Sequence, residues 1–225
     1  MPIESDDVDR ILEPEVMDDE QQAVAYAEAD FSSSNQMFVE GLIDAHAARL
    51  GTVLDIGCGP GDIPIGLAHA RPSAYIVAVD ASDVMVRLAN EAVNRAALAG
   101  RIQVAQGRIP GLKVRRGGFG AIVSKDLLHH LPDPMVFWEE VKRLARAGTA
   151  VYVMDLFRPA TPEAATQIVE SVSPNEAEIL KRDFYNSLLA AFTPDEVRDQ
   201  LRRAGLELEV EVVSERHMRV KGVLG

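Results

Sequence analysis

The segment VLDIGCGPG, residues 53–61, decides the fold of this chain. Its apolar start predicts a buried strand over residues 52–56, and the three glycines that follow at alternate positions predict a sharp turn. Glycine lacks a Cβ, so the backbone of such a turn can approach a ligand closely. A helix is predicted over residues 62–70, with its first N–H groups directed toward that ligand. A strand, a glycine turn and a helix in this order are typical of the ligand-binding unit of a doubly wound α/β sheet.

Further apolar segments alternate with amphipathic ones along the rest of the chain. Helical crossovers separate most of them, which predicts parallel strands in a sheet covered on both faces. The last two strands are joined by so few residues that they predict an antiparallel hairpin at the edge of the sheet. The predicted fold class is therefore α/β, with a doubly wound seven-stranded sheet that ends in a C-terminal antiparallel hairpin. The strands after the first are expected at residues 75–80, 102–105, 119–124, 150–156, 206–213 and about 217–223.

The N-terminal region, residues 1–50, is predicted to be an acidic tail followed by a helical cap. Helices are expected over residues 16–30 and 35–50, with the serines at 32–34 separating them and capping the second helix. The remaining residues, 51–225, are predicted to form one domain with inserted helices at about 161–191. A chain of 225 residues suits one sizeable core better than two.

The negative charge of the chain is concentrated near its N-terminus. The formal net charge is −12, and residues 1–30 carry −10 of it through eleven carboxylates and a single arginine, Arg10. The near-neutral remainder does not show the basic surface that phosphate backbones require, so no nucleic-acid partner is expected.

Composition also argues against membrane, secretory and thiolate-metal classes. No apolar run approaches the roughly 20 residues that span a bilayer, so no membrane association is expected. The acidic N-terminus shows neither a secretory signal nor a transit peptide, and the expected location is the cytoplasm. The single cysteine, Cys58, leaves a disulfide or a thiolate cluster without partners, and no metal site is predicted. The sequence leaves a homodimer open.

Two segments carry a resemblance to a known family. The segment at 53–61 does not fit the dinucleotide pattern G-x-G-x-x-G, whose third glycine would fall on Asp62; it resembles the first motif of class I S-adenosylmethionine-dependent methyltransferases. The segment LHHLPDP, residues 128–134, resembles one found after the fourth strand of many small-molecule methyltransferases. The resemblance covers about residues 50–156. It implies a Rossmann-like sheet that binds S-adenosylmethionine and releases S-adenosylhomocysteine.

The resemblance also implies roles for individual residues. Asp55 would lie beside the methionine part of the cofactor, Asp80 would accept hydrogen bonds from both ribose hydroxyls, and Met85 would pack on the adenine. The guanidinium of Arg108 has only donors, where the family often has an aspartate that accepts from adenine, so adenine recognition here is expected to use backbone groups or stacking. The cofactor-binding residues expected are Asp55, Gly57, Cys58, Gly59, Gly61, Asp80, Ala81, Met85, Gly107, Arg108, Ile109 and Ser124.

Methyl transfer from a sulfonium is an in-line displacement, and positioning alone can supply ~7 to 11 kcal/mol of barrier reduction. A general base is therefore optional. The candidates at the end of the fourth strand are His129, His130 and Asp126. Alternatively, one histidine packs structurally, and Asp126 pairs only with Lys125.

The resemblance implies a small-molecule acceptor in a pocket closed by the N-terminal helices and the helical insertion. Tyr26, Lys125, Tyr185 and Asn186 are the predicted substrate-binding residues, because this region mixes aromatic surface with a few polar groups. The alternatives are a methyltransferase acting on RNA or protein, and a protein that binds S-adenosylmethionine without catalysis.

Overall fold

The computed structural model describes residues 9–14, 16 and 19–225 of the chain. Its strands are β1 (Thr52–Ile56), β2 (Tyr75–Asp80), β3 (Ile102–Gln106), β4 (Ala121–Lys125), β5 (Ala150–Leu156), β6 (Glu209–Val212) and β7 (His217–Val223). Its helices are α1 (Glu20–Glu28), α2 (Ser32–His46), α3 (Asp62–Ala70), α4 (Asp83–Arg95), α5 (Met135–Leu144), α6 (Pro162–Val172), α7 (Glu178–Ala190) and α8 (Pro194–Ala204), with short 3-10 helices η1 (Ala47–Arg49) and η2 (Leu128–His130).

The strands form one seven-stranded sheet in the order β3-β2-β1-β4-β5-β7-β6. Strands β1 to β5 are mutually parallel, whereas β7 is antiparallel to both β5 and β6. The order of strands reverses between β1 and β4, which opens a crevice at their carboxyl ends. The predicted Rossmann-like, doubly wound sheet with its C-terminal hairpin is confirmed.

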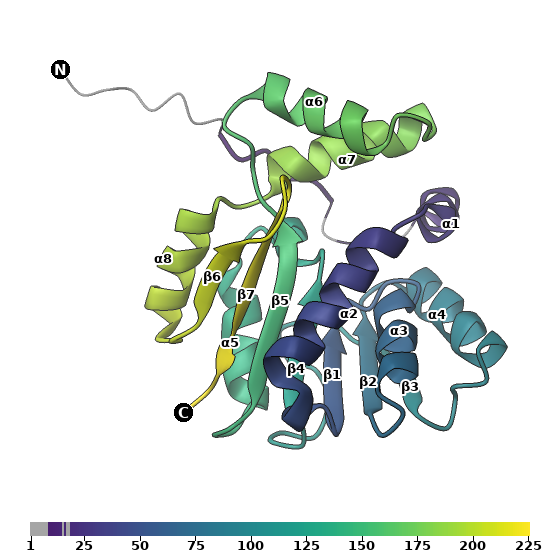
Figure 1. Ribbon diagram of the computed structural model, residues 1–225, viewed down its shortest axis with the longest axis vertical. Coiled ribbons are helices and arrows are strands. Elements are labelled where there is room, and N and C mark those ends of the chain that lie inside the picture. The colour runs from purple at the N-terminus through teal and green to yellow at the C-terminus, as the bar shows by residue number, and fades with distance from the viewer. Residues whose placement is uncertain (1–8, 15, 17–18) are drawn as a thin grey trace.

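Helices cover both faces of the sheet (Figure 1). Helices α2, α3 and α4 pack on one face around Phe38, Leu67 and Val93. Helices α5 and α8 pack on the other face, where the buried Trp138 donates to Gln200 at 2.9 Å. Helices α6 and α7 pack on each other beyond the carboxyl edge of the sheet, at the top of Figure 1. None of the described helices is long and apolar enough to cross a bilayer.

The junction between α1 and α2 differs from the prediction. Helix α2 begins at Ser32 with Phe31 as its N-cap, so the prediction that the serines cap it is wrong. The helix end is instead satisfied by Asp30, whose Oδ1 accepts from the backbone N–H of Ser32 at 2.9 Å. The break therefore falls at residues 29–31, and the rings of Tyr26 and Phe31 pack across it with centroids 4.7 Å apart.

A buried carboxylate fixes the loop that follows β3. Glu140 of α5 is 1% exposed, and its Oε1 accepts from the backbone N–H groups of Gly111 at 3.1 Å and Leu112 at 2.7 Å. Arg143 donates to the same carboxylate at 2.6 Å and to the carbonyl of Leu112 at 2.9 Å. These contacts hold the loop at 107–112 against α5, beside the crevice of the sheet.

We expect Glu140→Ala to destabilise the protein by about 3 kcal/mol, because two buried N–H groups and the Arg143 guanidinium would lose a charged acceptor. Urea unfolding followed by circular dichroism measures this loss. Glu139→Ala is the matched control, since Glu139 lies on the same helix with its side chain 57% exposed. A change below about 0.5 kcal/mol in both variants would show that the buried carboxylate does not stabilise the fold.

Candidate active site

The glycine turn after β1 is pinned to the neighbouring strand β2. The backbone N–H groups of Gly57 and Cys58 donate to the carbonyl of Val79 at 2.8 and 3.1 Å, and that of Gly59 donates to Asp80 Oδ2 at 2.8 Å. All three glycines of the turn have positive φ, with Gly61 at 98°. A Cβ at Gly57 would lie 3.0 Å from Leu127, whereas one at Gly59 would meet open space. The turn therefore packs closely against Leu127 at Gly57, whereas it faces open space at Gly59.

A carboxyl group without partners lies beneath this turn. Asp55, in β1, is 1% exposed, and neither of its carboxyl oxygens has a hydrogen-bond partner. Burial raises the pKa of Asp55 to about 8, and the nearby Asp80 raises it further while Lys125 opposes the shift. A buried polar group with no partner is unusual and costly, and it indicates a site completed by a polar or cationic ligand.

The cleft above Asp55 collects most of the predicted cofactor residues. Its volume is about 130 Å³ in this conformation. Its walls come from the glycine turn, the ends of β2 and β4, the start of α4 and the loop after β3. The lining residues include Asp55, Gly57, Cys58, Gly59, Asp80, Ala81, Met85, Gly107, Arg108, Ile109, Lys125 and Asp126.

Two predicted cofactor residues lie outside the lining of the cleft. Ser124 is fully buried, and its hydroxyl donates to the carbonyl of Ile56 at 2.7 Å between two strands. It therefore joins β4 to the end of β1. Gly61 instead packs against α4, where a Cβ would lie 3.3 Å from Ala89.

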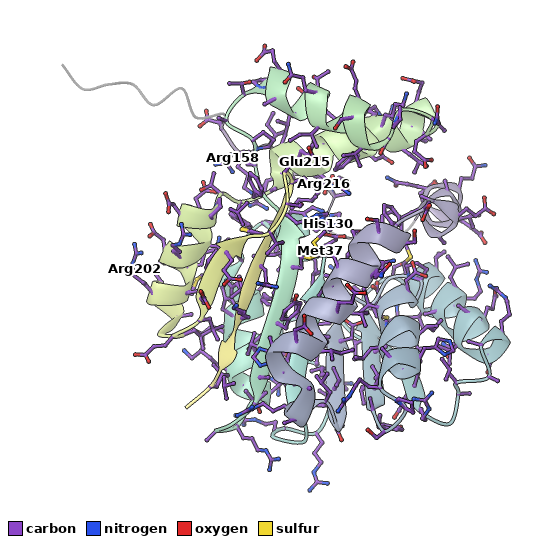
Figure 2. All side chains as sticks on the ribbon, in the orientation of Figure 1. Met37, His130, Arg158, Arg202, Glu215 and Arg216 are labelled. Carbon is purple, nitrogen blue, oxygen red and sulfur yellow. The ribbon has the colours of Figure 1, made fainter. Side chains whose placement is uncertain are left out.

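A second cavity of about 500 Å³ adjoins the cleft. Its walls come from the α1–α2 junction, η2, helices α6 and α7, and the β6–β7 turn. The two cavities share the side chains of Tyr26, Phe31, Asp126 and His130. Figure 2 shows His130 beneath the turn that carries Glu215 and Arg216, which also line this cavity.

Comparisons with known proteins agree with this arrangement. Residues 53–148 match the model of a family described as a methyltransferase domain. Residues 53–148 of the chain therefore form a methyltransferase domain. Its fold is similar to the crystal structure of a SAM-dependent methyltransferase from Aquifex aeolicus, with a TM-score of 0.71 and 20% identity over 92% of this chain and 99% of that one.

Two curated relatives are named for their reactions. This chain is 27% identical to demethylmenaquinone methyltransferase of Lactiplantibacillus plantarum over 52% of this chain and 50% of the relative. It is 28% identical to ubiquinone biosynthesis O-methyltransferase of Xanthomonas oryzae pv. oryzae over 76% of this chain and 68% of the relative. The methyltransferase spans half or less of the length of several other curated relatives.

The three predicted bases of the methyltransferase differ in their surroundings. Asp126 forms a buried ion pair with Lys125; burial would raise the pKa of Asp126, but the charges of Lys125 and His217 lower it to about 2. Burial lowers the pKa of His130 to about 3, so this imidazole is neutral. At neutral pH, the imidazole of His130 can therefore accept a hydrogen bond, whereas Asp126 supplies a fixed negative charge.

His129 is held by acidic groups on both sides. Its Nδ1 lies 2.6 Å from Asp155 Oδ1, and its Nε2 lies 3.5 Å from Glu13 Oε1. Burial alone would lower the pKa of His129, but the charges of Asp155 and Glu13 and the hydrogen bond to Asp155 outweigh it and raise that pKa. His129 lines only the second cavity, so the two adjacent histidines face different surroundings.

The helical insertion contributes different residues from those predicted. Neither Tyr185 nor Asn186 lines a cavity: Tyr185 packs on the apolar cluster between α6 and α7, and Asn186 is exposed. Helical spacing is the reason, because the cavity is lined one and two turns apart along α7 by Leu180, Asp183, Phe184 and Ser187. The helical period of this segment could have identified that face.

The sequence reasoning also missed the contribution of residues 9–14. The guanidinium of Arg10 donates to the carbonyls of Ala190 at 2.5 Å, His129 at 2.7 Å and Leu131 at 2.9 Å, and it stacks on Phe192 at 3.8 Å. It therefore ties the N-terminal segment to η2 and to the end of α7. The acidic composition around Arg10 gives no signal for such a contact.

We expect Arg10→Ala to destabilise the methyltransferase by about 2 kcal/mol, because three carbonyls would lose a charged donor. Urea unfolding measures the loss, and limited proteolysis should show faster cleavage near residues 9–14. Arg198→Ala is the control, because the Arg198 side chain is 46% exposed and pairs with an exposed aspartate. Unchanged stability and unchanged cleavage in Arg10→Ala would show that Arg10 does not hold residues 9–14 against η2 and α7.

Proposed function

We propose that this methyltransferase transfers the methyl group of S-adenosylmethionine to a small-molecule acceptor held in the second cavity. The observation that carries the proposal is the 500 Å³ cavity that shares a wall with the cofactor cleft. A cavity of this size is within the range that encloses drug-sized ligands. The two relatives named as a demethylmenaquinone methyltransferase and a ubiquinone biosynthesis O-methyltransferase support a small acceptor.

In this proposal the chain's own residues hold the donor from three sides. The carboxylate of Asp80 accepts from the ribose hydroxyls while it keeps its bonds to the N–H groups of Gly59 and Ser82 at 2.8 and 3.0 Å. Asp55, whose carboxyl oxygens have no hydrogen-bond partner in the protein, faces the methionine portion of the donor. It gains the donor's ammonium group as a cationic partner. Met85, 4% exposed and in the lining of the cleft, supplies apolar surface for the adenine.

The acceptor side works chiefly by positioning. The donor supplies an electrophilic methyl on a sulfonium that leaves as a neutral thioether. The wall shared by the two cavities, made of Tyr26, Phe31, Asp126 and His130, is where acceptor and methyl would meet. The anionic Asp126 stabilises positive charge there, and the neutral His130 offers a hydrogen-bonding group that can orient the acceptor.

The ionisation of Asp55 makes donor binding pH-dependent. Its pKa of about 8 means that the free protein holds this proton at pH 7. An ammonium bound beside Asp55 favours the ionised carboxylate, so binding of the donor should release a proton. The affinity for the donor should therefore rise as the pH approaches 8, by at most about tenfold per pH unit.

Titration calorimetry with S-adenosylhomocysteine at pH 7, in buffers of different ionisation enthalpy, measures that proton release. Asp55→Asn is the control, because it keeps the side-chain shape and cannot release a proton. Identical proton release in the wild type and in Asp55→Asn would remove Asp55 from the donor site.

A cavity-filling variant tests the acceptor assignment. Leu180→Trp adds bulk to the lining of the second cavity, and we expect it to reduce methyl transfer at least tenfold while the affinity for S-adenosylhomocysteine stays within about twofold. Ile179→Trp is the matched control, since Ile179 is the preceding residue on α7, is 46% exposed and lies outside the cavity lining.

The assay follows labelled methyl groups from S-adenosylmethionine into the metabolite, RNA and protein fractions of a cell extract. Label in the metabolite fraction that is lost in Leu180→Trp supports the proposal. Label confined to RNA or protein would overturn the small acceptor, and donor binding without transfer to any fraction would favour a non-catalytic protein.

A further inference from the structure

Three side chains of metal-binding type converge in the N-terminal wall of the second cavity. They are the adjacent His129 and His130 of η2, which line the cavity, and Glu13 from the segment at 9–14, which lies behind them and outside the cavity lining. One ligand atom from each lies within 4.8 Å of the others. Figure 2 labels His130 at the carboxyl end of the sheet, and both histidines line the cavity.

The spacing of these atoms is compatible with a bound ion. Glu13 Oε1 lies 3.1 Å from His130 Nδ1 and 3.5 Å from His129 Nε2. Ligands at ~2.0 to 2.1 Å from a tetrahedral Zn²⁺ are separated by about 3.3 Å. The buried His130 Nδ1 has no hydrogen-bond partner even though the carboxylate is so close. The two groups therefore approach each other without the alignment of a hydrogen bond.

Neighbouring groups orient two of the three side chains. His129 Nδ1 bonds to Asp155 Oδ1 at 2.6 Å, and Asp155 Oδ2 accepts from the backbone N–H of Leu128 at 2.7 Å, which leaves His129 Nε2 directed at Glu13. A carboxylate behind the far nitrogen is the usual support of a metal-binding histidine. The hydroxyl of Ser187 donates to the Glu13 carboxylate at 3.0 Å.

We propose that Glu13, His129 and His130 bind a divalent transition-metal ion of the Zn²⁺ type. Two imidazoles and one carboxylate form a three-residue set that leaves a coordination position open. Because the histidines line the second cavity, that position is available to a hydroxyl or thiol of the acceptor. This role toward the acceptor rests on the proposed function, whereas binding of the ion does not.

Calorimetry with ZnCl₂ on the full-length, tag-free, chelator-dialysed protein tests the site. We expect one ion per chain, with affinity reduced at least tenfold in Glu13→Gln and in His130→Ala. His69→Ala is the control and should bind as the wild type does, because His69 is exposed near the far end of α3. Thermal unfolding and the affinity for S-adenosylhomocysteine verify that each variant is folded, independently of any methyl transfer.

Co²⁺ provides a second readout, because its visible absorption reports coordination by protein ligands. We expect this absorption in the wild type and in His69→Ala and its loss in His130→Ala. No stoichiometric Zn²⁺ binding by the wild type would overturn the proposal. Binding that persists unchanged in both Glu13→Gln and His130→Ala would also overturn it, since the ion would then lie elsewhere.

Discussion

The hydrogen bonds between the glycine turn and the end of β2 are the constraint on which the site depends. Val79 receives two backbone N–H groups from the turn, and the Asp80 carboxylate receives a third at 2.8 Å. The turn therefore sits directly over the buried Asp55, and the crevice between β1 and β4 acquires a carboxylate on its floor and another on its wall. Glycine is favoured at 57, 59 and 61 because all three have a positive φ, and a Cβ at Gly57 or Gly61 would also crowd a neighbour.

The second half of the site depends on a segment remote in sequence. Arg10 joins residues 9–14 to η2 and to the end of α7 through three carbonyls. This contact lies beside the one that Glu13 makes with the two histidines behind the wall of the larger cavity. The N-terminal segment is thus part of the site rather than only an acidic tail.

The sheet and the cofactor cleft could be predicted because their signals are local. The bounds of β1, β2, β5, β7 and α3 agree with those expected from apolar runs and glycine positions. Ser82 caps α4 through an equally local contact, since its hydroxyl accepts from the Met85 N–H in the first turn of the helix. The family resemblance implied cofactor roles for Asp55, Asp80 and Met85, and all three line one cleft.

The rest of the site could not be predicted because its contacts join distant residues. Nothing near Arg10 or Glu13 in the sequence indicates that they meet η2, more than a hundred residues away. The direction of Ser124 depends on a bond across to β1, and the face of α7 depends on how α6 covers it. The burial of His217, which is 2% exposed, likewise depends on the position of β7 between β5 and β6 in the sheet.

In the proposed function, the wall common to both cavities would couple the exchange of donor and acceptor. Tyr26 and Phe31 pack on each other at the α1–α2 junction, over the donor cleft and the larger cavity alike. An exposed ion pair between Glu20 and Arg87 joins helix α1 to α4, and such a pair contributes little stability. A molecule seated in the larger cavity would brace this aromatic pair against opening. S-adenosylhomocysteine would then leave after the methylated product. The α1–α2 junction, rather than the sheet, would set the order in which the products are released.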